Sequence, residues 1–170
     1  MTERRHPSVV HLSEAPTRTV EKGTRFGFTN RILGHTTGGT GLGCTWYEVP
    51  AGRTAFPAHY HCATEEAIFV LEGEGTLRIG ADKVPLLAGD YVTLRPGPDH
   101  AHQLVNTGSS PLRYLCMSTL VRADVVGYPD SKKVGAMGVP PGWKFPGPAW
   151  VRVMCREDSN LDYYDGESVE

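Results

Sequence analysis

The chain has 170 residues, which fits one ordinary domain, and its 17 Lys+Arg and 19 Asp+Glu leave a net charge of −2 when the histidines are neutral. Basic residues adjoin only in pairs such as Arg4-Arg5 and Lys132-Lys133, so binding to a nucleic-acid backbone has no visible electrostatic source. Apolar runs are far shorter than the roughly 20 residues of a membrane helix, and the first residues lack the apolar segment of a secretion signal. We therefore expect a cytoplasmic protein with neither a nucleic-acid nor a membrane partner.

Cysteine usage and chain length bear on what a metal would do here. The four cysteines, Cys44, Cys62, Cys116 and Cys155, are widely spaced and form no Cys-x-x-Cys pair, which is typical of reduced thiols and not of a disulfide framework or a zinc knuckle. A chain of this length buries roughly two thirds of its unfolded surface, which is enough for a stable core. A metal found in this protein would therefore indicate function.

In chain order, short runs of β-branched and aromatic residues alternate with turns rich in the 20 glycines and 13 prolines, a pattern typical of an all-β domain. Short strands at regular spacing with glycine turns favour a sandwich or a barrel. The pattern predicts strands near residues 25–33, 44–49, 66–72, 75–79, 83–87, 91–95, 102–106, 112–120 and 151–155.

The remaining segments predict the domain organisation and the oligomeric state. We expect one domain over residues 1–170, with a barrel core at about 24–120 and a C-terminal wrapping arm and acidic tail over 121–170. The arm includes the Pro- and Gly-rich segment 140–148, which cannot form a regular strand. The run Ala67–Leu71 is apolar on both faces, so the N-terminal segment or a second subunit must cover one of them, and we expect a homodimer.

Two separate pieces of the sequence carry candidate metal ligands. In the first, His59 and His61 flank Tyr60, and on an extended strand residues two apart point to the same face. A His-x-His pair alone is more often structural, but Glu66 follows at the head of a predicted strand and makes a metal site the better interpretation. Glu65 is the alternative carboxylate.

The second piece runs from Gly89 through the Pro96-Gly97 turn into a strand that carries His100 and His102. The turn sets the distance at which a third imidazole follows, and we expect the two histidines to share one strand face. Spacing alone leaves both open as the third ligand. We favour His102, because the strand that follows is registered to it, and treat His100 as a candidate substrate-binding residue.

Together these pieces resemble the cupin superfamily, whose motifs read Gly-x5-His-x-His-x3–4-Glu-x6-Gly and Gly-x5-Pro-x-Gly-x2-His-x3-Asn. The chain matches the first with His59, His61, Glu66 and Gly73, whereas Glu65 stands one residue too far from that glycine. In the second motif Gly89 and Gly97 are recognisable, His100 satisfies Gly-x2-His, and His102 satisfies His-x3-Asn with Asn106. Two departures stand out: six residues separate Gly52 from His59, and Arg95 occupies the proline position. The flanking segments resemble a group of single-domain bacterial cupins.

The resemblance implies a double-stranded β-helix, or jelly-roll barrel, that holds a single metal ion at its mouth. Three imidazoles and a carboxylate, from His59, His61, His102 and Glu66, suit one divalent ion of Fe, Mn, Ni, Co or Zn, and the ligands alone do not choose among them. We expect a metalloenzyme of the oxygenase or isomerase type that acts on a small organic molecule. The alternative is a non-catalytic protein that binds or senses a small molecule through its metal. No catalytic residue beyond the ligands can be assigned from the sequence.

Overall fold

The computed structural model describes residues 6–143 and 147–168, and these residues form thirteen strands and three 3-10 helices. Within those ranges, no helix has the length and apolar character required to cross a membrane. The 3-10 helices are η1 (Leu12–Glu14), η2 (Pro98–His100) and η3 (Pro129–Ser131). The strands are β1 (Thr17–Lys22), β2 (Phe26–Ile32), β3 (Leu42–Val49), β4 (Tyr60–His61), β5 (Glu66–Glu72), β6 (Glu74–Ile79), β7 (Asp82–Leu87), β8 (Tyr91–Leu94), β9 (His102–Val105), β10 (Leu112–Thr119), β11 (Ala123–Tyr128), β12 (Lys133–Gly138) and β13 (Val151–Arg156).

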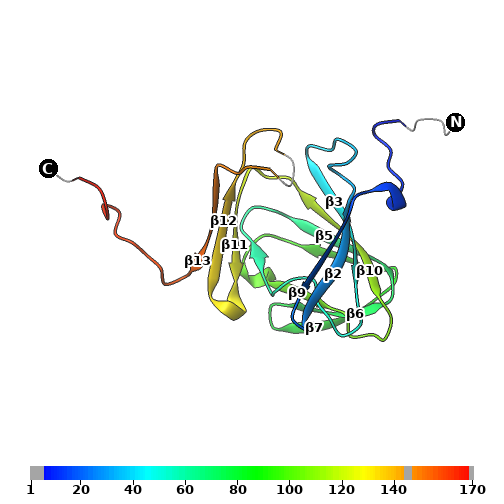
Figure 1. Ribbon diagram of the computed structural model, residues 1–170. Coiled ribbons are helices and arrows are strands. Elements are labelled where there is room, and N and C mark those ends of the chain that lie inside the picture. Colours follow the sequence, from blue (N-terminus) through cyan, green and yellow to red (C-terminus); the bar gives the residue numbers. More distant parts are fainter. Residues whose placement is uncertain (1–5, 144–146, 169–170) are drawn as a thin grey trace.

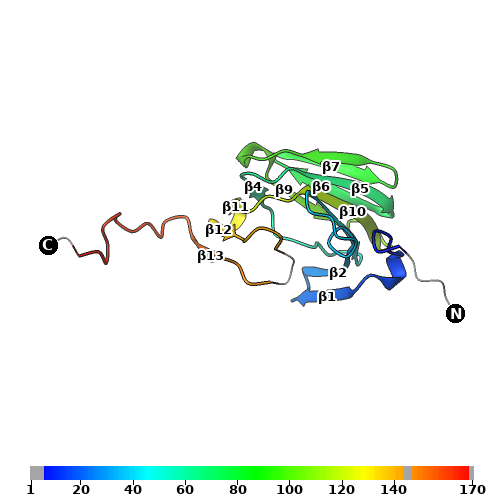
Figure 2. The ribbon, with the colours of Figure 1, turned by 90° about the horizontal axis from the view of Figure 1, so that it is seen from above.

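The strands form a jelly roll of antiparallel sheets. A six-stranded sheet has the order β1-β2-β3-β10-β5-β8, and a three-stranded sheet has the order β7-β6-β9. Seen from above, β1 and β2 lie on one side of the molecule and β5, β6 and β7 on the other (Figure 2). Neighbours distant in sequence, such as β3 with β10 and β6 with β9, are the crossovers of this fold. The expectation of an all-β jelly roll is confirmed.

The hydrophobic core lies between these two sheets. It includes Phe28 from β2, Val70 from β5, Leu77 from β6 and Leu112 from β10. Val70 and Leu112 are both 0% exposed, so the core closes completely around them. This core is built without help from the candidate ligands, which lie at one end of it.

A third sheet, of order β13-β12-β11-β4, stands beside the barrel (Figure 1). Strand β4 belongs to this sheet and carries His61, so the sheet positions part of the candidate site. Beyond β13 the chain leads away from the domain to the C-terminus (Figure 1). Residues 144–146 of the predicted arm and 169–170 of the predicted tail lie outside the described residues.

Every strand expected from the sequence is present within two residues of its predicted bounds, but β1, β4, β11 and β12 were not among the predicted strands. Strand β1 reads TRTVEK, is mostly exposed and pairs only with β2, so it lacks the apolar alternation of a strand with one buried face. Strands β11 and β12 contain glycines and few large apolar residues, so the sequence pattern was weak. These strands are stabilised by pairing with their neighbours in the sheet, and the β-propensity of their own residues is too weak to predict them.

The apolar run in β5 has one face in the core and one nearer the surface. Ile68 and Val70 are buried, whereas Phe69 is half-buried and Leu71 is 43% exposed. Leu87 and Tyr91 are also exposed large apolar residues. The homodimer that would cover the outer face stays a prediction.

Gly73, which closes the turn between β5 and β6, is the glycine whose replacement should destabilise the fold most clearly. Its φ is +84°, and an added Cβ would lie 2.6 Å from the Pro111 carbonyl oxygen. Gly52 has a similar φ of +74° but open space around the same position. We expect Gly52→Ala to lower the free energy of unfolding by about 1–2 kcal/mol through backbone strain alone, and Gly73→Ala to lower it by about 3 kcal/mol or more because the backbone must also move. Urea denaturation of both variants measures the difference, and equal losses would contradict the argument.

Candidate metal centre

A backbone pair joins His59 to His102, although the two residues lie far apart in sequence. The N–H of His59 donates to the carbonyl of His102 over 3.1 Å, and the N–H of His102 donates back to the carbonyl of His59 over 2.8 Å. The two imidazole centroids lie 4.6 Å apart. One isolated β-bridge thus fixes the two motif histidines side by side at the end of the barrel.

His61 is held by β4, whose partner is β11. The backbone pairs with Val126, and the carbonyl of His61 also accepts from the N–H of Gly97 over 2.8 Å. Its imidazole lies 5.3 Å from that of His59, centroid to centroid. Tyr60 packs its ring against Gly127, where an added Cβ would lie 2.2 Å from the ring.

Glu66 opens β5, between β10 and β8, and points toward the histidines. Its Oε2 lies 3.5 Å from Nε2 of His61 and 3.4 Å from Nε2 of His102. Ligand atoms of His59, His61 and Glu66 all lie within 4.8 Å of one another, a group that could hold a metal ion. Glu65, the other carboxylate, is exposed.

All three imidazoles use their Nδ1 atoms for hydrogen bonds to oxygen acceptors. His59 Nδ1 lies 2.9 Å from the carbonyl of Pro57, and His102 Nδ1 lies 3.0 Å from the carbonyl of His100. His61 Nδ1 lies 2.6 Å from a carboxylate oxygen of Asp124. Carbonyl and carboxylate oxygens only accept, so each Nδ1 carries the proton. In the neutral ring this leaves the lone pair on Nε2, the atom required of a ligand.

The charges of this cluster call for a cation. If His61 and His102 are neutral, the lone pairs of two Nε2 atoms face the Glu66 carboxylate, and this arrangement is repulsive without a positive charge nearby. A metal ion or additional protons on the imidazoles would supply that charge. Burial lowers the pKa of His59 to about 4, an effect that the neighbouring His102 reinforces, so His59 stays neutral at neutral pH. The donor set therefore fits a divalent metal ion well.

The pKa of Glu66 also suits a ligand. Burial alone would raise it, but positive charge beside the carboxylate at His102 and His61 outweighs burial and brings the pKa below its usual value. Cys116 in β10 reaches the other carboxylate oxygen, with its Sγ 3.6 Å from Oε1. Burial raises the pKa of the Cys116 thiol well above its ordinary value, so this sulfur stays protonated and donates to Glu66.

Asp124 is a functional candidate that the sequence reasoning missed. It accepts from His61 through one oxygen, and from the N–H of Ala63 over 2.9 Å through the other. Burial tends to raise its pKa, but hydrogen bonds from Thr64, His61 and Ala63 lower the pKa below the ordinary value. Asp124 comes from β11, an unpredicted strand, and no spacing signal connects it to the histidine motif.

The expectation that His100 and His102 share a strand face was wrong. His100 is the last residue of η2, and β9 begins only at His102. Proline and glycine before His100 favour a tight turn over an extended strand at this point. The backbone carbonyl of His100 accepts a hydrogen bond from the His102 ring. The side chain of His100 lines neither of the two cavities beside the cluster. The distances to Glu66 favour His102 as the third imidazole.

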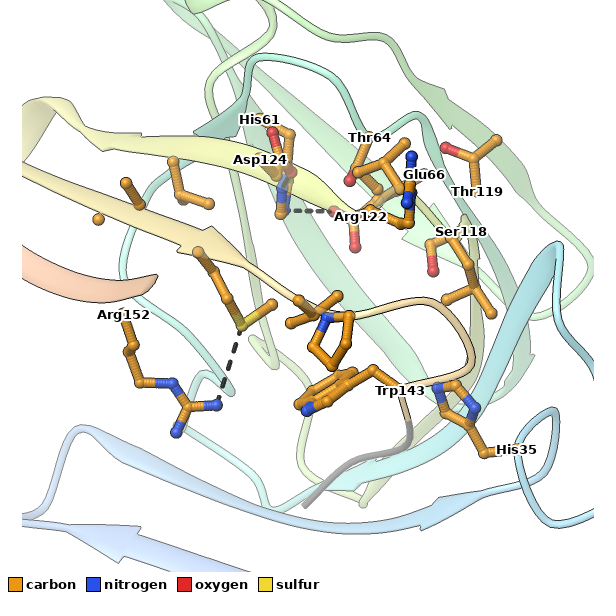
Figure 3. A pocket seen from close by; sticks show the side chains of 18 of the residues that line it. His35, His61, Thr64, Glu66, Ser118, Thr119, Arg122, Asp124, Trp143 and Arg152 are labelled. Atoms are coloured by element: carbon orange, nitrogen blue, oxygen red, sulfur yellow. Dashed lines mark hydrogen bonds and ion pairs between the residues drawn. The ribbon is translucent and has the colours of Figure 1, made fainter. Parts of the chain in front are cut away.

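Two cavities meet at this cluster. The inner one, of about 270 Å³, lies inside the barrel and includes His59, His102 and Cys116 in its lining. The outer one, of about 530 Å³, lies between the barrel and the third sheet (Figure 3). Both are lined by His61, Glu66, Val126 and Tyr128. A molecule in either cavity would therefore reach the same ligand cluster.

Two of the half-buried arginines of the barrel, Arg31 and Arg113, are engaged away from these cavities. Arg31 donates to three carbonyls of the N-terminal segment, and Arg113 pairs with Glu48 and Glu72. The outer cavity is instead lined by Arg122 and Arg152, which sequence reasoning did not single out.

Comparison with known proteins gives a consistent picture. Residues 45–118 match the family model of the Cupin domain. An uncharacterised protein from Methanocaldococcus jannaschii is 34% identical over 70 residues, which are 41% of this chain and 54% of that protein. Quercetin 2,3-dioxygenase from Bacillus subtilis is 29% identical over 76 residues, 44% of this chain and 23% of the dioxygenase. The chain thus spans about half of the first relative and about a quarter of the second.

Two solved structures are similar over most of the chain. A sugar phosphate isomerase of the cupin superfamily from Silicibacter pomeroyi has a TM-score of 0.75 at 20% identity and covers 92% of this chain and 98% of its own. A protein from Acidithiobacillus ferrooxidans, described provisionally as a sugar phosphate isomerase, has a TM-score of 0.66 at 26% identity and covers 80% of each chain.

Proposed function

Because this chain contains a cupin-type domain, we propose that it acts on a small organic molecule as a mononuclear metalloenzyme of the oxygenase or isomerase type. One observation carries the proposal. Each of the three imidazoles has its Nδ1 tied to an acceptor, and the Nε2 atoms of His61 and His102 lie within 3.5 Å of the same Glu66 oxygen.

His59, His61, His102 and Glu66 would hold the ion, and the chemistry of nitrogen and carboxylate donors suits Fe, Mn, Ni, Co or Zn. A bound divalent ion supplies Lewis acidity, which polarises an oxygen of the substrate. The protein's own part is to orient the imidazoles and to fix the proton on Nδ1, which the three Nδ1 hydrogen bonds do.

Tyr128 is the candidate proton donor beside the ligands. It lines both cavities, and its ring lies 6.2 Å from the His59 ring in a stacked arrangement. Burial raises the pKa of its hydroxyl, so the group is protonated at neutral pH. Tyr128 would therefore donate a hydrogen bond or a proton to a substrate held at the ligand cluster.

Each of the two reaction types is supported by a different relative. The dioxygenase from Bacillus subtilis supports an oxygenase, and the Acidithiobacillus ferrooxidans protein supports an isomerase. An isomerase that moves a proton needs a base beside the substrate.

A second candidate function is non-catalytic binding or sensing of a small molecule through the metal. Beyond the four ligands, the titratable side chains of the inner cavity are Tyr47, Tyr114, Cys116 and Tyr128. Burial raises the pKa of all four, so none of them is a base at neutral pH. For a ligand held in the inner cavity, this lack of a base in the described lining favours binding over proton abstraction, and an oxygenase over an isomerase.

Elemental analysis of natively produced protein tests the proposal. We expect one divalent ion per chain, removable by a chelator, and a rise in melting temperature when the metal-free protein is reloaded. Iron together with oxygen consumption in the presence of organic acids would support the oxygenase, and tight ligand binding without turnover would support the sensor. Protein that neither contains metal nor takes it up would overturn both.

A further inference from the structure

The outer cavity has a charge pattern that the ligand cluster does not explain. Four charged side chains line it, two acidic and two basic: Glu66, Asp124, Arg122 and Arg152. The acidic pair already contacts the histidines, since Glu66 lies beside His61 and His102, and Asp124 accepts from His61. The two arginines are therefore the charges to account for.

Within the part of the chain that the structure describes, no carboxylate neutralises either arginine. Among residues 6–143 and 147–168, no carboxylate lies within 4.0 Å of the Arg122 or Arg152 guanidinium. Arg152 makes a long contact from Nη2 to the Met137 sulfur, at 3.8 Å. In Figure 3, Arg152 and His35 lie on either side of Trp143, while Arg122 lies toward Glu66. Basic groups thus stand around a cavity that leads to the ligand cluster.

The rest of the lining is largely apolar. Large apolar side chains come from the barrel edge, the third sheet and the segment between β12 and β13, namely Leu120, Val126, Met137, Val139, Trp143 and Met154. Two of the hydroxyls are already engaged, because Thr64 bonds to Asp124 and Thr119 accepts from the N–H of Glu65. A polyhydroxylated sugar would leave several hydroxyls without partners here, and each unpaired polar group is unfavourable.

We propose that the outer cavity binds an organic carboxylate with an apolar aryl or alkyl body, whose carboxylate pairs with Arg122 or Arg152. Guanidinium groups match the planar carboxylate, and the apolar lining matches the body of the ligand. A volume of about 530 Å³ is in the range of pockets for small organic ligands. Glu66 and Asp124 in the same lining disfavour a doubly charged phosphate ester. The inference rests on the proposed function, since it names the substrate class of that site.

Binding of cinnamate, phenylacetate and octanoate to the full chain, measured by isothermal titration calorimetry, tests this assignment. Cinnamamide has the cinnamate body without the charge, and glucose 6-phosphate carries charge on a polyhydroxylated body. We expect at least one carboxylate to bind ten-fold or more tightly than either. The double variant Arg122→Gln/Arg152→Gln should lose at least ten-fold in carboxylate affinity and leave any cinnamamide binding unchanged. Arg95→Gln, an exposed arginine outside both cavities, is the matched control.

The assignment is overturned if none of the three carboxylates binds, if glucose 6-phosphate binds more tightly, or if the double variant binds like wild type while its circular dichroism spectrum and melting temperature are unchanged. Titrations with both metal-free and metal-loaded protein separate this inference from the proposed function. Arginine-dependent binding to a protein that takes up no metal would refute the metalloenzyme and retain the carboxylate site. Metal uptake without arginine-dependent binding would do the opposite.

Discussion

Replacing His102 with alanine is expected to reduce the bound metal from one ion per chain to less than a tenth of that value after dialysis. The reason is that His102 Nε2 lies 3.4 Å from Glu66 Oε2, and its Nδ1 proton is already committed to the His100 carbonyl. Loss of this imidazole removes one of four ligands and leaves the Glu66 carboxylate facing a cavity. The same loss is expected for His61→Ala, whose Nε2 is equally close to Glu66. Elemental analysis by mass spectrometry measures the stoichiometry.

His100→Ala is the matched control for this experiment. It removes an imidazole only two residues away, but keeps the backbone carbonyl that holds the His102 ring. We expect His100→Ala to retain at least four fifths of the wild-type metal. All three variants should keep the β-sheet circular dichroism spectrum, because the core of Val70, Leu77 and Leu112 does not involve the histidines. A greater loss in His100→Ala than in His102→Ala would show that the ligand assignment is wrong.

The barrel and the local part of the candidate site were predictable from the sequence because their signals are short in range. Strands β2, β3 and β5 to β10 alternate with glycine and proline turns, and His59, His61 and Glu66 lie within one eight-residue stretch. His102 could be favoured because it opens a strand that follows a fixed turn. Residues 45–118, which contain these motifs, match the model of the Cupin domain, as the resemblance predicted.

The remaining candidates could not be predicted because long-range pairing brings them to the site. Asp124, Tyr128 and Arg122 lie in or beside β11, which reaches the histidines only by pairing with β4. Arg152 lies two pairings further, since β13 pairs with β12 and β12 with β11. Weakly apolar strands such as β11 and β12 carry little local signal, and sheet register rather than sequence spacing decides which side chains meet.

Asp124→Asn should weaken metal binding by about 10- to 100-fold without unfolding the protein, the size of effect expected when a hydrogen-bond partner of a metal-binding histidine is lost. The carboxylate accepts from both His61 Nδ1 and the Ala63 N–H. An asparagine side chain has one oxygen and one NH₂ group, so it cannot accept from both. If the NH₂ group faces His61, the ring must turn or move its proton to Nε2, and that tautomer cannot bind a metal.

Competition with a chromophoric chelator measures the metal affinity of the Asp124→Asn variant, and the melting temperature of metal-free protein reports on folding. Asp130→Asn is the matched control, because Asp130 is an exposed carboxylate that pairs with Arg78 away from both cavities. We expect Asp130→Asn to bind metal like wild type. If Asp124 were merely structural, its variant would lower the melting temperature and leave the affinity of the remaining folded protein unchanged. An affinity loss at equal melting temperature would instead identify Asp124 as the residue that fixes the His61 tautomer.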